Sequence, residues 1–251
     1  SAFCGRNFEY YSEDPLLSGK LASSCISGAA SRGVLSYMKH FALNNYEGPA
    51  TCLTVWATEQ AIREIYLRSF EIAVKEASCE LLYYENDSVD LSCKTMRAAT
   101  GIMGAANNIG VEWCAASYPL LQGVLRKEWG FQGALITDMA LQLRPGIVDK
   151  IFRNGGDMRM YYYDAALLDP DSPAALASLR RAVKNICYAY ANSNLMQGYA
   201  PGMIVSYGIA PWRMMLYVFD GAVLIAWIIG IVKCMRDRRR RAIQKQWYGA
   251  R

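Results

Sequence analysis

Five polar side chains of this chain have the chemistry to bind and attack a polar ligand. They are Arg6, Lys39, His40, Asn107 and Asp138. His40 is the only histidine among the 251 residues, and it follows Lys39 just after the apolar run Val34–Met38. Arg and Lys donate charge-assisted hydrogen bonds, and a nearby cation keeps a carboxylate such as Asp138 ionised and nucleophilic. These residue types can bind a polar ligand, but taken alone a single histidine or aspartate more often has a structural role.

The elements that must hold these residues are expected to alternate between strands and helices. The sequence predicts strands at 33–41, 98–103, 131–137 and 157–161. It predicts helices at 14–31, 57–77, 118–129, 147–153 and 173–193. Asp14-Pro15 and Thr58 are typical of helix starts, and Gly33 and Gly130 of helix ends. The polar residues 79–96 predict a hairpin or an inserted loop.

This alternation of strands and helices predicts a parallel α/β architecture. In a (β/α)8 barrel the chemistry lies at the carboxyl ends of the strands. Lys39-His40, Asn107 and Asp138 all follow or end a predicted strand in this way. We therefore expect them to gather at one edge of the sheet.

Charge and cysteine spacing exclude two classes of site. Residues 233–251 hold eight Lys or Arg against Asp237, a net charge of +7, so the +5 of the whole chain leaves −2 for residues 1–232. The body is therefore not expected to bind nucleic acid. The eight cysteines include no C-x-x-C pair, which argues against a zinc site, and we expect mostly buried free thiols. No metal or cofactor is predicted.

A candidate membrane segment runs from Met214 to Val232, 19 residues with one charged side chain, Asp220. A helix of this length spans about 28 Å, close to the hydrocarbon thickness of a bilayer. Lys233 and the run Arg238–Arg241 follow it. The positive-inside rule then places the C-terminus in the cytoplasm and the body outside. The alternative, a buried core helix, rarely runs straight into four arginines.

Five stretches make residues 1–196 resemble the barrel domain of glycoside hydrolase family 3, the β-glucosidase-like enzymes. They are GRNFEYYSEDPLLSG (5–19), GVLSYMKHFALNNYE (33–47), WATEQAIREIYLRSFEIAVKEA (56–77), LRKEWGFQGALITDM (125–139) and NGGDMRM (154–160). By this resemblance, Asp138 is the nucleophile of a retaining mechanism, which forms a covalent glycosyl-enzyme. Arg6, Lys39 and His40 match residues that hold sugar hydroxyls, and Asn107 is placed in the same site. The absence of a second histidine favours the glucosidase-like branch over the branch that removes N-acetylglucosamine.

The chain departs from the family pattern in three ways. It begins at the arginine block, so the opening barrel strands are expected upstream or in trans. The acid/base glutamate usually lies in a separate domain after the barrel, where this chain has a membrane segment. Ala106 stands where family members often carry an aromatic residue. The resemblance therefore implies a partial (β/α)8 barrel, of TIM type, that lacks its first strands and is followed by a single transmembrane helix.

The predicted organisation is a partial barrel at 1–196, a linker at 197–210, a transmembrane helix at 211–233 and a basic cytoplasmic tail at 234–251. The predicted function is hydrolysis of glycosides by a single-pass, membrane-anchored enzyme with an extracytoplasmic body, of which this chain is a poorly active part. The alternative is a non-catalytic remnant that binds saccharide or tethers a partner at the membrane. A Ser/His/Asp hydrolase would need a G-x-S-x-G elbow, which the sequence lacks.

Overall fold

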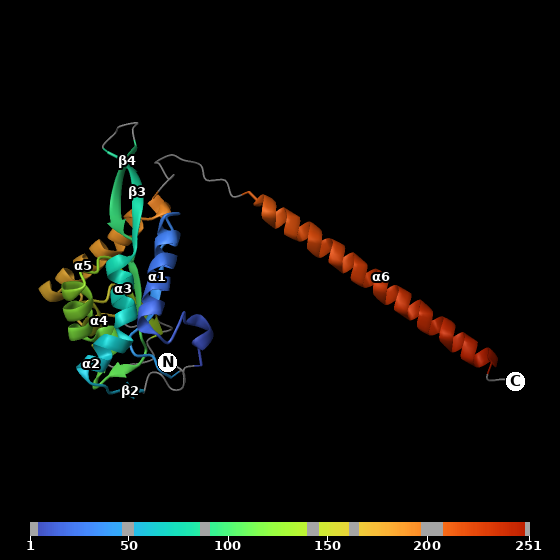
Figure 1. The fold of residues 1–251 in the computed structure, drawn as a ribbon, viewed down its shortest axis with the longest axis horizontal. Coiled ribbons are helices and arrows are strands. Elements are labelled where there is room, and N and C mark those ends of the chain that lie inside the picture. The colour runs from blue at the N-terminus through green and yellow to red at the C-terminus, as the bar shows by residue number, and fades with distance from the viewer. Residues whose placement is uncertain are drawn as a thin grey trace. The chain divides into compact units, whose positions relative to one another are not determined.

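The computed structural model describes residues 5–46, 53–85, 91–139, 146–160, 166–196 and 208–248, with the backbone alone at Tyr84, Met196 and 242–248. The chain divides into two units, Ser1–Tyr199 and Ala200–Arg251 (Figure 1). The first unit carries the strands, and the secondary structure described in the second is one long helix. Most of the predicted linker, 197–207, lies outside the described residues.

A four-stranded parallel sheet forms the centre of the first unit. Its strands, in spatial order, are β1 (Tyr37–Phe41), β5 (Gly101–Gly104), β8 (Ala134–Met139) and β9 (Met158–Met160). Spatial order follows chain order, and helical segments connect each strand to the next, as parallel pairing requires. The predicted α/β class is therefore confirmed, and each predicted strand overlaps an observed one.

The helices of the first unit largely begin where the sequence predicts. They are α1 (Pro15–Ala30), α2 (Glu59–Ala61), η2 (Ile62–Tyr66), α3 (Arg68–Glu76), η4 (Pro119–Glu128), α4 (Ile147–Arg153) and α5 (Pro173–Ala191), with short 3-10 turns η1 (Asn7–Glu9), η3 (Cys114–Ala116) and η5 (Asn194–Met196). Asp14 caps α1 by accepting from the Leu16 amide at 2.7 Å, and Thr58 accepts from Ala61 at 3.2 Å. The helix predicted at 57–77 is interrupted, because η2 has π-helical hydrogen bonding.

The main hydrophobic core lies between the sheet and these helices. Phe41, Ile102 and Leu135 from three adjacent strands are fully buried in it, together with Leu121 and Leu125 of η4. Helices α4 and α5 lie on the side of the unit away from α1 (Figure 1). The buried apolar residues hold each strand in place in the core. The polar residues at its carboxyl end therefore lie at the edge of the sheet.

Two smaller sheets complete the first unit. β3 (Ser78–Tyr84) and β4 (Leu91–Arg97) form an antiparallel hairpin, the first of the two alternatives predicted for the polar segment, and it projects beyond the helices (Figure 1). β2 (Thr54–Val55), β6 (Asn108–Ile109) and β7 (Glu112–Trp113) form a short three-stranded sheet that the sequence does not predict. Strands of two residues are too short to show a periodicity.

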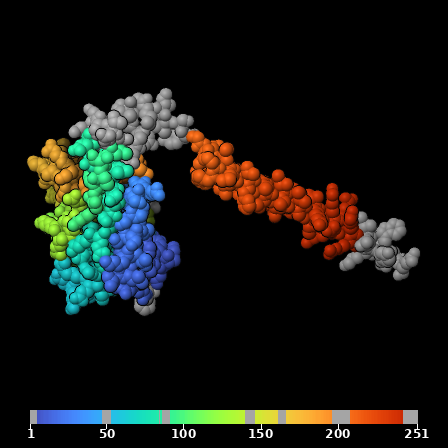
Figure 2. Space-filling view, turned by 45° about the horizontal axis from the view of Figure 1, so that its top comes forward, coloured from blue at the N-terminus to red at the C-terminus, as the bar shows by residue number. Residues whose placement is uncertain are grey.

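The second unit contains α6 (Pro211–Tyr248), whose described side chains are almost all exposed along its length (Figure 2). The most apolar 18-residue window of its segment Pro211–Arg241 has a mean hydropathy of 2.2 and no buried part. By length and composition it is the one helix among the described residues that could cross a membrane.

Gly133 controls the approach of β8 to the loop before β5. Its φ is +144°, and a Cβ there would lie 2.2 Å from the Thr100 carbonyl oxygen. We expect Gly133→Ala to lower the free energy of unfolding by about 2–3 kcal/mol, because backbone must move to admit the methyl group. Urea unfolding followed by tryptophan fluorescence measures this change.

The matched control is Gly123→Ala in η4, where a Cβ meets no atom within 4 Å. There the same substitution should leave the protein as stable or up to about 1 kcal/mol more stable, because alanine favours the helix. Equal stability of both variants would contradict the close approach at Gly133.

Candidate active site

The candidate site lies at the carboxyl ends of β1 and β8, on either side of β5. β1 ends with Lys39, His40 and Phe41, and β8 ends with Asp138 and Met139. His40 Nε2 lies 3.6 Å from Asp138 Oδ2, with 3% of the imidazole and 19% of the carboxylate side chain exposed. This distance is longer than a hydrogen bond, and the two groups form an ion pair only when the imidazole is protonated. The structure therefore brings together two of the predicted site residues, 98 positions apart in the chain.

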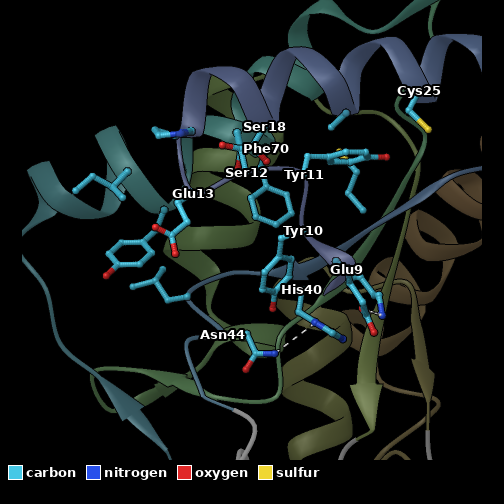
Figure 3. A pocket seen from close by; sticks show the side chains of 18 of the residues that line it. Glu9, Tyr10, Tyr11, Ser12, Glu13, Ser18, Cys25, His40, Asn44 and Phe70 are labelled. Carbon is cyan, nitrogen blue, oxygen red and sulfur yellow. Dashed lines mark hydrogen bonds and ion pairs between the residues drawn. The ribbon is translucent and has the colours of Figure 1, made fainter. Parts of the chain in front are cut away.

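Arg6 joins this pair from the segment before η1. Its Nη1 atom lies 3.3 Å from His40 Nε2, so the imidazole nitrogen stands between a guanidinium and a carboxylate. On the other edge of the ring, Asn44 Nδ2 lies 3.4 Å from His40 Nδ1, and Figure 3 shows this contact. Both contacting groups are donors and an imidazole has at most one acceptor nitrogen, so at most one of these two contacts is a hydrogen bond as drawn.

Lys39 reaches the cluster through Glu9, which the sequence analysis does not assign to the site. Glu9 Oε2 lies 2.6 Å from Lys39 Nζ, and the Glu9 carboxylate also accepts from Arg6 Nε and Nη2 at 2.8–3.0 Å. The hydrogen bonds from Lys39 and Arg6 lower the pKa of Glu9, which keeps its carboxylate ionised at neutral pH. The spacing of Arg6 and Glu9 on one 3-10 turn signals their pairing, but nothing in the sequence signals the contact with Lys39.

Asp138 has one of its carboxylate oxygens occupied by the backbone. Oδ1 accepts from the Met139 amide at 2.7 Å, while Oδ2 is the atom that faces His40. The side chain keeps part of its surface open to solvent. A carboxylate held by its own strand end, beside an imidazole and a guanidinium, can act as an anionic nucleophile.

Asn107 lies outside this cluster. It is completely buried, and its amide Nδ2 donates to the Ala42 carbonyl at 3.3 Å and contacts Cys114 Sγ at 3.4 Å. A side chain without exposed surface does not touch a ligand in this conformation. What Asn107 does here is to hold the turn that follows β1 against η3.

A cavity of about 650 Å³ lies beside the cluster, between α1, β1 and the η2–α3 segment (Figure 3). It includes His40 and Lys39 in its lining, along with aromatic rings of Tyr10, Tyr66 and Phe70, whereas Asp138 does not line it. Residues 36–40 all line it. Because alternate strand residues face opposite sides, five consecutive ones mean that the outer edge of β1 faces the cavity.

The six described cysteines are free, and four of them, Cys25, Cys93, Cys187 and Cys234, are exposed. The expectation of buried thiols therefore holds for Cys79 and Cys114 alone. Burial raises the pKa of the Cys114 thiol to about 12. No group of three His, Cys, Asp or Glu side chains within the described ranges is arranged to hold a metal ion.

Comparison with known proteins gives one consistent result. The family model of the glycosyl hydrolase family 3 N terminal domain matches residues 2–150. Beta-glucosidase A of Butyrivibrio fibrisolvens is 42% identical over 138 residues, which are 55% of this chain and 14% of that protein. Thermostable beta-glucosidase B of Acetivibrio thermocellus is 39% identical over 138 residues, 55% of this chain and 16% of that protein.

Solved structures agree with these matches. Beta-glucosidase 3B from Thermotoga neapolitana in complex with glucose superposes with a TM-score of 0.61 and 33% identity, covering 78% of this chain and 26% of that one. A beta-glucosidase from Paenibacillus barengoltzii gives a TM-score of 0.63 and 30% identity, covering 82% and 23%. The fold is therefore of the TIM-barrel-like α/β type. The chain spans only a small part of the length of these relatives.

Proposed function

Because the chain belongs to glycosyl hydrolase family 3, we propose that its first unit is part of a β-glucosidase-like enzyme that hydrolyses the O-glycosyl bonds of glycosides. The observation that supports this proposal most strongly is the contact of Asp138 with His40, which in turn contacts Arg6. The deciding experiment is whether a covalent glycosyl ester forms at residue 138.

In the proposed reaction, Asp138 attacks the anomeric carbon with its free carboxylate oxygen. The bond to the leaving oxygen breaks as the ester forms, and water later hydrolyses the ester with net retention. Lys39, Arg6 and His40 bind hydroxyl groups of the sugar through charge-assisted hydrogen bonds. Asn107 contributes indirectly, by fixing the turn after β1.

The second carboxyl group of a retaining enzyme must protonate the leaving oxygen. Glu9 is unsuited to this task, because its two cationic partners lower its pKa whereas a general acid needs a raised one. We propose that the acid/base is supplied by a domain upstream or by a second chain. The isolated chain would then be poorly active on ordinary glycosides.

We propose that the remaining strands of the barrel are likewise supplied upstream or in trans. The sheet has four described strands where a closed barrel has eight, and the β1 edge faces the 650 Å³ cavity rather than another described strand. Helix α1 also exposes apolar side chains, Leu17 and Leu21 among them. A preceding strand and helix, supplied upstream or in trans, would pair with β1 and cover α1.

For the second unit we propose a single-pass anchor at 211–233, after the linker 197–210, with the basic tail 234–251 in the cytoplasm and the body outside. The apolar, unburied segment of α6 and the arginines after it support this orientation. The partners of the chain would be a glycoside and the cell membrane.

The exposed cysteines provide a test of this topology. We expect a membrane-impermeant maleimide added to intact cells to label Cys25, Cys93 or Cys187, because these thiols are exposed on the body. Cys234, which follows the span, should react only after the membrane is permeabilised. Labelling of Cys234 from outside, or of no body cysteine, would contradict the orientation. Single-cysteine variants read by mass spectrometry distinguish the sites.

A second candidate function is a non-catalytic barrel remnant that binds saccharide or tethers a partner at the membrane. Two observations favour it: Asp138 does not line the cavity beside His40, and Ala106 provides no aromatic wall. Saccharide binding without any covalent ester at Asp138 would decide for this candidate.

A further inference from the structure

We propose that Glu9 is a positioning residue of the saccharide site, whose carboxylate fixes Arg6 and Lys39 in the orientation in which they bind sugar hydroxyls. The inference rests on the proposed function of this site. It assigns a role to a residue that otherwise looks like half of a surface ion pair.

The contacts of Glu9 determine which edge of the Arg6 guanidinium is occupied. Nε and Nη2 of Arg6 both donate to Glu9 Oε1, at 3.0 and 2.8 Å, and Nη2 also reaches Oε2 at 3.0 Å. This edge-on pairing orients the planar guanidinium and leaves Nη1 directed at His40, 3.3 Å away. Without the carboxylate, the guanidinium would lose the three hydrogen bonds that orient this edge.

The same carboxylate holds a second cation of the site. Lys39 Nζ lies 2.6 Å from Glu9 Oε2. A lysine side chain has a flexible stem of four carbons, and it loses much conformational entropy when a ligand fixes it. Because Glu9 already fixes Lys39 before the sugar binds, binding of the sugar does not carry this entropic cost. Glu9 thereby couples the η1 turn to the end of β1, thirty residues along the chain.

Glu71 shows what an ordinary ion-pair residue looks like in this chain. It also bridges an arginine and a lysine, Arg68 at 2.8 Å and Lys75 at 2.6 Å, and 21% of its side chain is exposed against 23% for Glu9. Its partners, however, lie three and four residues away on the same helix. Glu9 instead joins two cations from different segments, both of them assigned to the site.

The experiment compares Glu9→Gln with Glu71→Gln in the full chain, held in detergent. His40 is the only histidine, so the imidazole signals in a proton–nitrogen NMR spectrum come from this residue alone. We expect Glu9→Gln to shift these signals and to weaken the binding of D-glucose about tenfold or more, since one anchor orients two ligand-binding cations. Glu9→Asp, which keeps the charge, should restore part of the affinity.

Glu71→Gln should change neither the His40 signals nor the glucose affinity. Unchanged His40 signals in Glu9→Gln would overturn the proposal, and so would equal shifts in both variants. If the wild-type chain binds glucose and Glu9→Gln binds it equally well, the positioning role is wrong while the proposed function stands. If the wild-type chain binds no glucose, the proposed function fails for this chain, and the His40 signals alone decide the role of Glu9.

Discussion

The Asp138→Asn variant is expected to form no covalent glycosyl-enzyme under conditions in which the wild-type chain does. The substrate that shows this best is 2,4-dinitrophenyl 2-deoxy-2-fluoro-β-glucoside, because its leaving group departs without a proton. The acid/base that we place outside this chain is then not required for the first step. Intact-mass spectrometry followed by peptide mapping should find the sugar on Asp138 of the wild type. Loss of a covalent nucleophile lowers turnover by roughly a thousandfold or more.

The dependence of the cleavage rate on the leaving group tests whether this chain holds its own acid/base. General acid catalysis contributes about 10²–10⁴ to the rate, and this contribution should be missing from the isolated chain. We therefore expect measurable release of dinitrophenolate from a β-glucoside but little methanol from a methyl glucoside. Fast cleavage of both would mean that this chain holds its own acid.

The control for Asp138→Asn is Asp171→Asn, which removes an exposed carboxylate before α5 and outside the site. It should leave labelling and dinitrophenolate release unchanged. Labelling that persists in Asp138→Asn would contradict the role of this residue, as would a sugar mapped to another carboxylate.

The largest expected effect on stability comes from Asp157→Ala. The Asp157 side chain is fully buried and accepts from Arg126 Nη2 at 2.6 Å, from the Leu135 amide at 2.8 Å and from Asn185 Nδ2 at 2.8 Å. Burial raises the pKa of Asp157, and these three donors offset part of that effect. Truncation leaves the Arg126 charge, 10% exposed, without its carboxylate.

Breaking a buried ion pair on one side costs about 3–5 kcal/mol. Domains are stable by about 5–15 kcal/mol, so the variant should unfold at a much lower urea concentration or fail to accumulate. Asp157→Asn, which keeps an acceptor for the Leu135 amide, should lose less. Replacing both partners, by Arg126→Met with Asp157→Leu, should recover part of the loss, because the Arg126 charge is then gone while the Leu135 amide and Asn185 still lack their acceptor. A double variant no more stable than Asp157→Ala would contradict this account.

Much of the fold could be predicted because its signals are local. Asp14-Pro15 and Thr58 mark helix starts through hydrogen bonds to amides two or three residues away. The apolar segment 131–137 marks a strand covered on both faces. The first strand was predicted from Gly33, yet β1 begins at Tyr37. Gly33 instead pairs through its carbonyl with the Asn194 amide, a contact 161 residues distant that no local pattern reveals.

In the candidate site, too, the features that depend on local signals could be predicted and those that depend on packing could not. The sequence places His40 and Asp138 at strand ends, and the structure brings them together. It places Asn107 at a strand end too, but the direction of a side chain depends on packing, and η3 buries this one. Glu9 was missed as a site residue because its link to Lys39 exists only after β1 has docked beside η1.

The β3–β4 hairpin leaves and rejoins the body at a single point, since the Ala98 amide donates to the Ala77 carbonyl at 2.9 Å across its base. That point precedes β5, at the amino ends of the parallel strands, whereas His40 and Asp138 stand at the carboxyl ends. The base of the hairpin packs against α1, where Cys79 and Met96 join Ile26 in a core cluster, so it is the outer part of the hairpin that can change in length without disturbing the strand ends. It offers an attachment point for a fluorophore or fusion partner on the side of the first unit remote from His40 and Asp138.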